Sequence, residues 1–90
     1  MYKLVYHPAV VAKDIPKLSA EWKAKIRATI ELRLTTQPDL YSQPLRRVLK
    51  GYRKLRVSEY RVVFKIEEQA VYIIAIIHRS KVYKTAAKRL

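Results

Sequence analysis

Cationic side chains are the main source of chemistry in this sequence. Its 90 residues contain twenty Lys and Arg but only seven Asp and Glu, so the formal net charge is +13. There is no Cys, a single Gly, and two histidines, His7 and His78, near opposite ends of the chain. This composition argues against a cysteine zinc site, a glycine-rich phosphate loop, a carboxylate pair and a hydrolytic triad. Cations, one histidine and one tyrosine remain as candidate reactive groups.

These groups match what RNA cleavage requires, because RNA carries its own nucleophile, the 2′-hydroxyl. The reaction must remove the 2′-OH proton, stabilise the negative charge that develops on the phosphate, and protonate the leaving 5′-oxygen. Arg and Lys can stabilise that charge, and His, Tyr or a Lys with a lowered pKa can transfer the protons. The inventory therefore fits metal-free RNA cleavage, and it also fits phosphate binding without cleavage.

The positive charge is concentrated in the second half of the chain. Residues 1–44 contain seven Lys and Arg against four Asp and Glu, whereas residues 45–90 contain thirteen against three. The densest stretch, Leu45–Arg61, has Glu59 as its single acid. A solvated surface that keeps a small protein soluble is the simpler interpretation, but an excess this localised favours an anionic partner such as nucleic acid.

The hydrophobic pattern predicts a single α+β domain over residues 1–90. A short strand at Tyr2–Tyr6 leads to a short helix that stops near Pro16, and then to an amphipathic helix capped by Ser19. Three strand-like runs with very short connections predict antiparallel hairpins, and Ser80 then caps a helix or tail. These last elements span Tyr52–Val57, Tyr60–Ile66, Ala70–Ile77 and Lys81–Leu90. The expected order is β-α-α-β-β-β(-α), a mostly antiparallel sheet with helices packed on one face.

Strand alternation predicts which basic side chains share a face of the sheet. The runs Tyr52–Val57 and Tyr60–Ile66 form the first predicted hairpin. If its apolar residues face the helices, then Lys54, Arg56 and Arg61 point to the opposite face. The run Ala70–Ile77 is apolar at nearly every position, which predicts a strand covered on both faces, and its end would bring further polar groups beside these cations. The candidate concave site consists of Lys54, Arg56, Arg61, His78, Arg79 and Tyr83.

A resemblance to a known family covers Leu45 to Tyr83. This stretch reads LRRVLKGYRKLRVSEYRVVFKIEEQAVYIIAIIHRSKVY, and it resembles the RelE/ParE toxin superfamily, the RelE branch in particular. The shared pattern is G-Y-R-K-L-R-V-x-x-Y-R-V-V-F, an apolar strand, and then H-R-S-K-V-Y. The resemblance implies the toxin of a type II toxin–antitoxin pair. RelE-like members enter the ribosomal A site and cut messenger RNA through its 2′-OH, without a metal.

The resemblance also implies roles for individual residues. By motif, the functional positions of RelE-like toxins correspond to Lys54, Arg61, Arg79 and Tyr83, and His78 matches a histidine that transfers protons in some relatives. The basic residues that we expect to bind RNA are Arg46, Arg47, Lys50, Arg53, Arg56, Lys65 and Lys81. No cofactor and no metal ligand are expected.

The expected partners are an acidic antitoxin protein and the ribosome with its messenger and ribosomal RNA. Two other functions stay open: a ParE-like inhibitor of DNA gyrase, which shares the fold but is not a nuclease, and an RNA-binding module without activity. The sequence shows no targeting signal, and its longest apolar run is shorter than the roughly 20 residues that span a bilayer. We therefore expect a cytoplasmic protein with no membrane partner.

Overall fold

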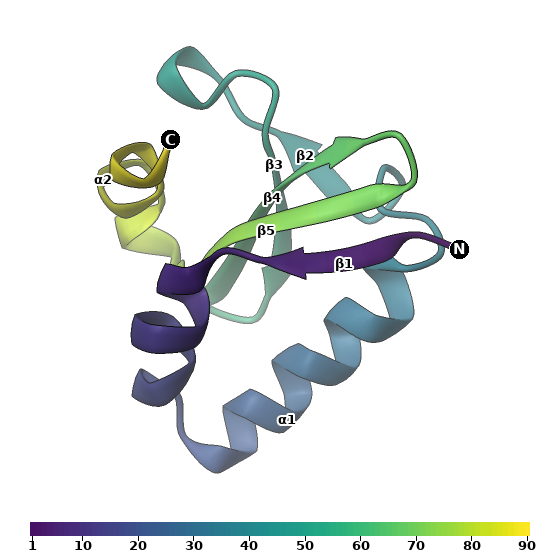
Figure 1. Ribbon diagram of the computed structural model, residues 1–90. Helices are drawn as coiled ribbons and strands as arrows, with labels where there is room; N and C mark the ends of the chain where they lie inside the picture. Colours follow the sequence, from purple (N-terminus) through teal and green to yellow (C-terminus); the bar gives the residue numbers. More distant parts are fainter.

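The computed structural model describes all 90 residues and contains one five-stranded sheet (Figure 1). The strands lie in the order β1-β5-β4-β3-β2, and only β1 and β5 are parallel neighbours. This mixed, mostly antiparallel sheet confirms the predicted α+β class. The strand bounds are Lys3–Tyr6 for β1, Ser42–Pro44 for β2, Arg53–Val57 for β3, Tyr60–Glu67 for β4 and Ala70–His78 for β5.

Two tight hairpins join β3 to β4 and β4 to β5, and they confirm the three predicted strand runs. Each connection is a two-residue turn, Ser58-Glu59 and Glu68-Gln69. Ser58 and Glu68 both have φ 54°, in the left-handed region that two-residue hairpin turns use. Short turns of this kind fix the pairing register, and the register decides which face each cation occupies.

The edge strand β2 is an element that sequence reasoning did not anticipate. Pro38 and Pro44 argue against a continuous element in this region, yet Ser42–Pro44 pairs antiparallel with β3. An edge strand tolerates proline because its outer side needs no ladder hydrogen bond. The result is that β3 becomes an interior strand.

Helix α1, Ala20–Thr29, covers the first face of the sheet, and Ser19 caps it as predicted: the Ser19 Oγ accepts the Trp22 N–H at 3.3 Å. A wider π-helical turn continues α1 to Leu34. The earlier helical segment runs from Val10 to Lys17 and so ends beside Pro16, as predicted. No helix of the structure is both long and apolar enough to cross a membrane.

The side chains that form the core on this first face come from the helical segments and from alternating strand positions: Val10, Leu18, Ile26, Ile30, Leu34, Leu55, Val62, Phe64, Val71, Ile73 and Ile76. They bury the apolar side of the β3–β4 hairpin. The opposite side of that hairpin is left for its charged residues, in the parity that the sequence predicted.

The second face of the sheet is covered too, which differs from the expected packing of all helices on one face. Helix α2, Val82–Ala86, packs there through Val82 and Ala86, with Leu45 and Leu49 from the loop before β3. Figure 1 shows α1 and α2 on different sides of the sheet. The physical reason is β5, whose apolar side chains point to both faces and need cover on each.

A bulge in β5 adds to this two-sided burial. Val63 pairs with Ala75 whereas Phe64 pairs with Ile73, so Ile74 has no partner across the ladder. Ile74 and Ala75 both belong to the core of the second face. This confirms the prediction that the strand is covered on both faces, and the extra residue shifts the alternation in the remainder of β5.

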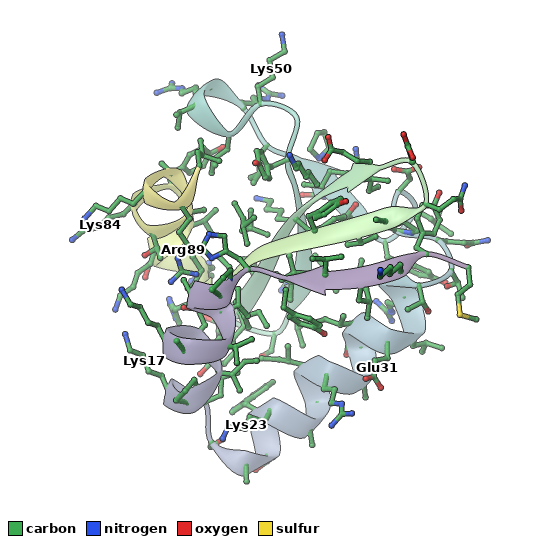
Figure 2. The ribbon with its side chains drawn as sticks, in the orientation of Figure 1. Lys17, Lys23, Glu31, Lys50, Lys84 and Arg89 are labelled. Atoms are coloured by element: carbon green, nitrogen blue, oxygen red, sulfur yellow. The ribbon has the colours of Figure 1, made fainter.

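A buried ion pair completes the edge of β5 where β1 ends. β1 pairs with β5 only as far as Ile73. Beyond that point the Asp14 carboxylate accepts the Ile76 N–H at 2.9 Å, and the Arg89 guanidinium donates to the Ile74 carbonyl at 2.9 Å. The two side chains also bind each other at 2.6 and 2.8 Å, and this hydrogen bonding raises the pKa of Arg89. Figure 2 shows Arg89 beside the C-terminal helix.

We expect Arg89→Met to lower the free energy of unfolding by about 3–5 kcal/mol, because it leaves a buried carboxylate without its cation. Urea unfolding measures the loss. Lys88→Met is the matched control, since Lys88 is the exposed neighbour and its replacement should change stability by less than about 0.5 kcal/mol. Equal stability of the two variants would show that the ion pair does not hold the C-terminus.

Candidate active site

A pocket of about 440 Å³ opens on the second face of the sheet, at the end of β5. Leu45 and Val82 form its apolar wall, and Ser80 also lines it. The other lining residues are the five expected to be catalytic: Lys54, Arg61, His78, Arg79 and Tyr83. The fold thus gathers residues from β3, β4, the end of β5 and the turn after it, α2 and the loop before β3 around one cavity, and no carboxylate lines it.

Arg61 is held in place by the turn that precedes it. Its guanidinium donates to the carbonyls of Ser58 and Tyr60, both at 2.9 Å. Partial burial and the nearby Arg56 and Arg79 lower the pKa of Arg61. Arg56 is the direct cross-strand partner of Arg61, although it does not line the pocket. An anion in the pocket would relieve this repulsion between like charges.

One ring nitrogen of the His78 side chain, Nδ1, is hydrogen-bonded within the protein, and the other, Nε2, is not. Its Nδ1 accepts the Ser80 N–H at 3.2 Å and lies 2.9 Å from the Ser80 hydroxyl. Because Nδ1 accepts a backbone N–H, the neutral ring carries its proton on Nε2. His78, not Ser80, is therefore the residue that caps the short helical turn Arg79–Lys81, which corrects the cap predicted at Ser80.

Arg79 links this turn to the β3–β4 hairpin. Its backbone N–H donates to the Glu59 carbonyl at 2.9 Å, and its Nε lies 3.2 Å from the Glu59 carboxylate. Both side chains are more than half exposed, so the ion pair contributes little to stability. Its effect is to orient the Arg79 guanidinium at the edge of the pocket.

Tyr83 closes the pocket from α2. Its side chain is 44% exposed, and its hydroxyl accepts the Arg46 N–H at 3.3 Å. Arg46 belongs to the loop whose Leu45 and Leu49 are buried against the sheet. The loop and α2 thus support each other, and the phenol is presented to the cavity.

The remaining predicted RNA-binding residues lie outside the pocket lining. Arg53 uses its guanidinium to bind the Ser42 hydroxyl at 2.7 Å and the carbonyls of Ser42 and Asp39. Lys65 lies further along β4 and pairs with Glu67 at 3.3 Å. The exposed members are Arg46, Arg47, Lys50, Arg56 and Lys81. Figure 2 shows Lys50 projecting away from the molecule.

The pocket residues are suited to a phosphate diester. Two guanidinium groups and one ammonium group supply charge and hydrogen bonds, and the imidazole and the phenol supply exchangeable protons. No three His, Cys, Asp or Glu side chains cluster anywhere in the structure in a way that could hold a metal ion. Sequence reasoning missed Leu45 and Val82, since their apolar pattern gave no sign that they border a site.

A second cavity lies on the opposite face of the sheet. It is an apolar groove of about 580 Å³ between α1 and the helical segment before it. Apolar residues such as Val11, Ile15 and Ile30 line it, and Lys23, Arg27 and Glu31 are its charged members. Val11 is 58% exposed there. Lys23 and Glu31 are labelled on α1 and its continuation in Figure 2.

Comparisons with solved structures support the fold. The RelBE2 toxin–antitoxin complex from Mycobacterium tuberculosis contains a chain with 26% identity and a TM-score of 0.75, matched over 87% of this chain and 98% of that one. A mutant of Escherichia coli RelE in complex with a RelBc antitoxin peptide has 23% identity and a TM-score of 0.69, over 99% and 97% of the two chains. The search of curated proteins found no match.

A family model matches residues 5–83, and its description is the ParE toxin of the type II toxin–antitoxin system parDE. The match includes both blocks that carry the RelE-like pattern and every pocket residue. The chain therefore belongs to the ParE toxin family of type II toxin–antitoxin systems, within the RelE/ParE superfamily.

Proposed function

We propose that this toxin is a metal-independent endoribonuclease that cuts messenger RNA in the ribosomal A site. The observation that carries the proposal is the pocket, in which Lys54, Arg61 and Arg79 surround a cavity together with His78 and Tyr83. This set supplies the positive charge and the proton-transfer groups that RNA cleavage needs. The nucleophile comes from the substrate.

The proposed reaction forms a bond between the 2′-oxygen and phosphorus and breaks the bond from phosphorus to the 5′-oxygen. The products are a 2′,3′-cyclic phosphate and a 5′-hydroxyl. Arg61 and Arg79 stabilise the charge that develops on the phosphate oxygens. Lys54, His78 and Tyr83 are the groups available to take the 2′-OH proton and to give one to the leaving oxygen, and neutral His78 offers the proton on its Nε2.

The exposed basic residues around the pocket fit a large RNA partner. Arg46, Arg47, Lys50 and Lys81 are all exposed, and the whole chain carries a formal charge of +13. Such a surface binds phosphate backbones without regard to sequence and loses affinity as salt rises. Ribosomal RNA would supply these contacts while the messenger enters the pocket.

The match to the ParE model favours a second candidate function, inhibition of DNA gyrase without nuclease activity. The two functions give different products in cells. Sequencing of RNA ends after induction should reveal cuts at fixed positions within codons, with no DNA-damage response. Intact transcripts together with induction of that response would instead establish the gyrase inhibitor.

Replacing Arg61 provides the sharpest test of the pocket. We expect Arg61→Ala to cut messenger RNA on purified ribosomes about 100- to 1,000-fold more slowly, because it removes a group that stabilises the transition state. Growth arrest on induction should disappear as well. The control is Arg33→Ala, an exposed position outside the pocket. Full activity of a folded Arg61→Ala protein would exclude the proposed site.

The apolar groove suits the antitoxin that we propose as partner. An amphipathic helix could bury its apolar side against Val11 and Ile15, while an acidic residue on its rim pairs with Lys23. The structure of Escherichia coli RelE with an antitoxin peptide shows that a short segment can bind a toxin of this fold. A net negative charge on the antitoxin would speed its encounter with this positively charged toxin.

Ala24→Glu tests this placement, since Ala24 lines the groove and is exposed on α1. We expect it to weaken binding of the small acidic protein encoded beside the toxin gene by at least tenfold, because a charge would enter the apolar contact. Ala28→Glu is the matched control: it is exposed on the same helix but outside the groove. Calorimetric titration gives both affinities, and equal values would place the antitoxin elsewhere.

A further inference from the structure

Three side chains form a row across the sheet, on the same face as the pocket but further along β4. Lys65 pairs directly with Tyr72 of β5. On its other side, Arg53 pairs with Phe64, so Tyr52 lies opposite Lys65. The Lys65 ammonium is 5.8 Å from the centroid of each tyrosine ring. The row therefore places one cation between two aromatic rings on neighbouring strands.

The row and the pocket are connected through β4. Arg61, Val63 and Lys65 alternate onto one face, and Val63 is buried in the core of the second face. Four residues of strand span ~13 Å. That distance corresponds to roughly two to four nucleotides of a single strand, given a rise of ~3.4 Å per stacked nucleotide. Leu45 and Leu49 cover Val63, so one RNA strand that reaches both places passes over the loop that contains these two leucines.

From this geometry we infer that Tyr52, Lys65 and Tyr72 form a second RNA contact, on which unpaired bases next to the cleavage position stack. The inference rests on the proposed function. Aromatic rings combined with cations are the usual platform for single-stranded nucleic acid, and they tolerate any base. Duplex RNA is excluded as the occupant because its bases are already stacked on each other.

The charges near the row agree with an anionic strand. Lys3 lies on the same face at the β1 edge, because Val5 pairs with Tyr72 and Lys3 is two residues before Val5. Glu67 is the acid beside the row, where it pairs with Lys65 at 3.3 Å, so Lys3 supplies the excess positive charge. Both tyrosines are partly exposed, so their rings combine support from the sheet with access from solvent.

The row should contribute to substrate binding and leave the chemical step unchanged, because it lies away from the reacting phosphate. A base held there also sets which phosphate reaches Arg61. Loss of the row is therefore expected to raise KM and to broaden the choice of cleavage position, while kcat stays the same.

The test uses the full chain and a 2′-O-methyl oligonucleotide, which cannot be cut and which carries 2-aminopurine as a fluorescent base. We expect Tyr72→Leu to weaken binding about tenfold and to abolish the quenching of 2-aminopurine. Tyr72→Phe should bind within twofold of the unchanged chain. The matched control is Tyr41→Leu, because Tyr41 also stacks with a cation, Arg33, outside this face.

Equal RNA affinity of Tyr72→Leu and Tyr41→Leu would overturn the inference. So would a Tyr72→Leu variant that loses antitoxin binding but keeps RNA binding, since the row would then be a protein contact. If Tyr72→Leu fails to fold, Lys65→Gln decides: it should lower the slope of log affinity against log salt by about 0.7, as expected for one lost contact with a single strand. The binding assay does not depend on cleavage. Failure of the proposed nuclease function would therefore appear in a different measurement, the cleavage rate of the Arg61→Ala variant on ribosomes.

Discussion

The buried pair of Asp14 and Arg89 is the constraint on which the candidate site depends. Strand β5 passes the end of β1 and would otherwise expose an unpaired N–H at Ile76 and an unpaired carbonyl at Ile74. The carboxylate and the guanidinium take the place of the missing strand, and no buried polar side-chain atom is left without a partner. Because Arg89 follows α2, the same contact fixes the helix that presents Tyr83.

A second constraint follows from gathering cations at one end of the sheet. Arg56 and Arg61 pair directly across the β3–β4 hairpin, and Arg79 adds a third positive charge close enough to lower the pKa of Arg61. This repulsion opposes folding, and the two apolar cores offset it. A bound phosphate would remove the repulsion, so affinity for an anion and stability of the fold are linked at this pocket.

Strand alternation made the pocket predictable, because parity alone places Lys54 and Arg61 on one face. The short hairpin turns then fix the register without any long-range information. Three features could not be found this way. The Asp14–Arg89 pair joins residues near opposite ends of the chain, β2 contains a proline that argues against a strand, and the bulge at Ile74 breaks the alternation that prediction relies on.

The two faces of the sheet give the molecule separate surfaces for its two proposed partners. Core residues of the first face, such as Ile26 and Ile30, line the apolar groove, whereas Leu45 and Val82 of the second face line the cationic pocket. A helix in the groove would leave the pocket open on the far side of the sheet. An antitoxin helix that binds only in the groove would therefore leave the proposed active site uncovered. To inhibit the toxin, the antitoxin chain must continue around the sheet to the cations of the pocket, or its size must keep the toxin away from the ribosome.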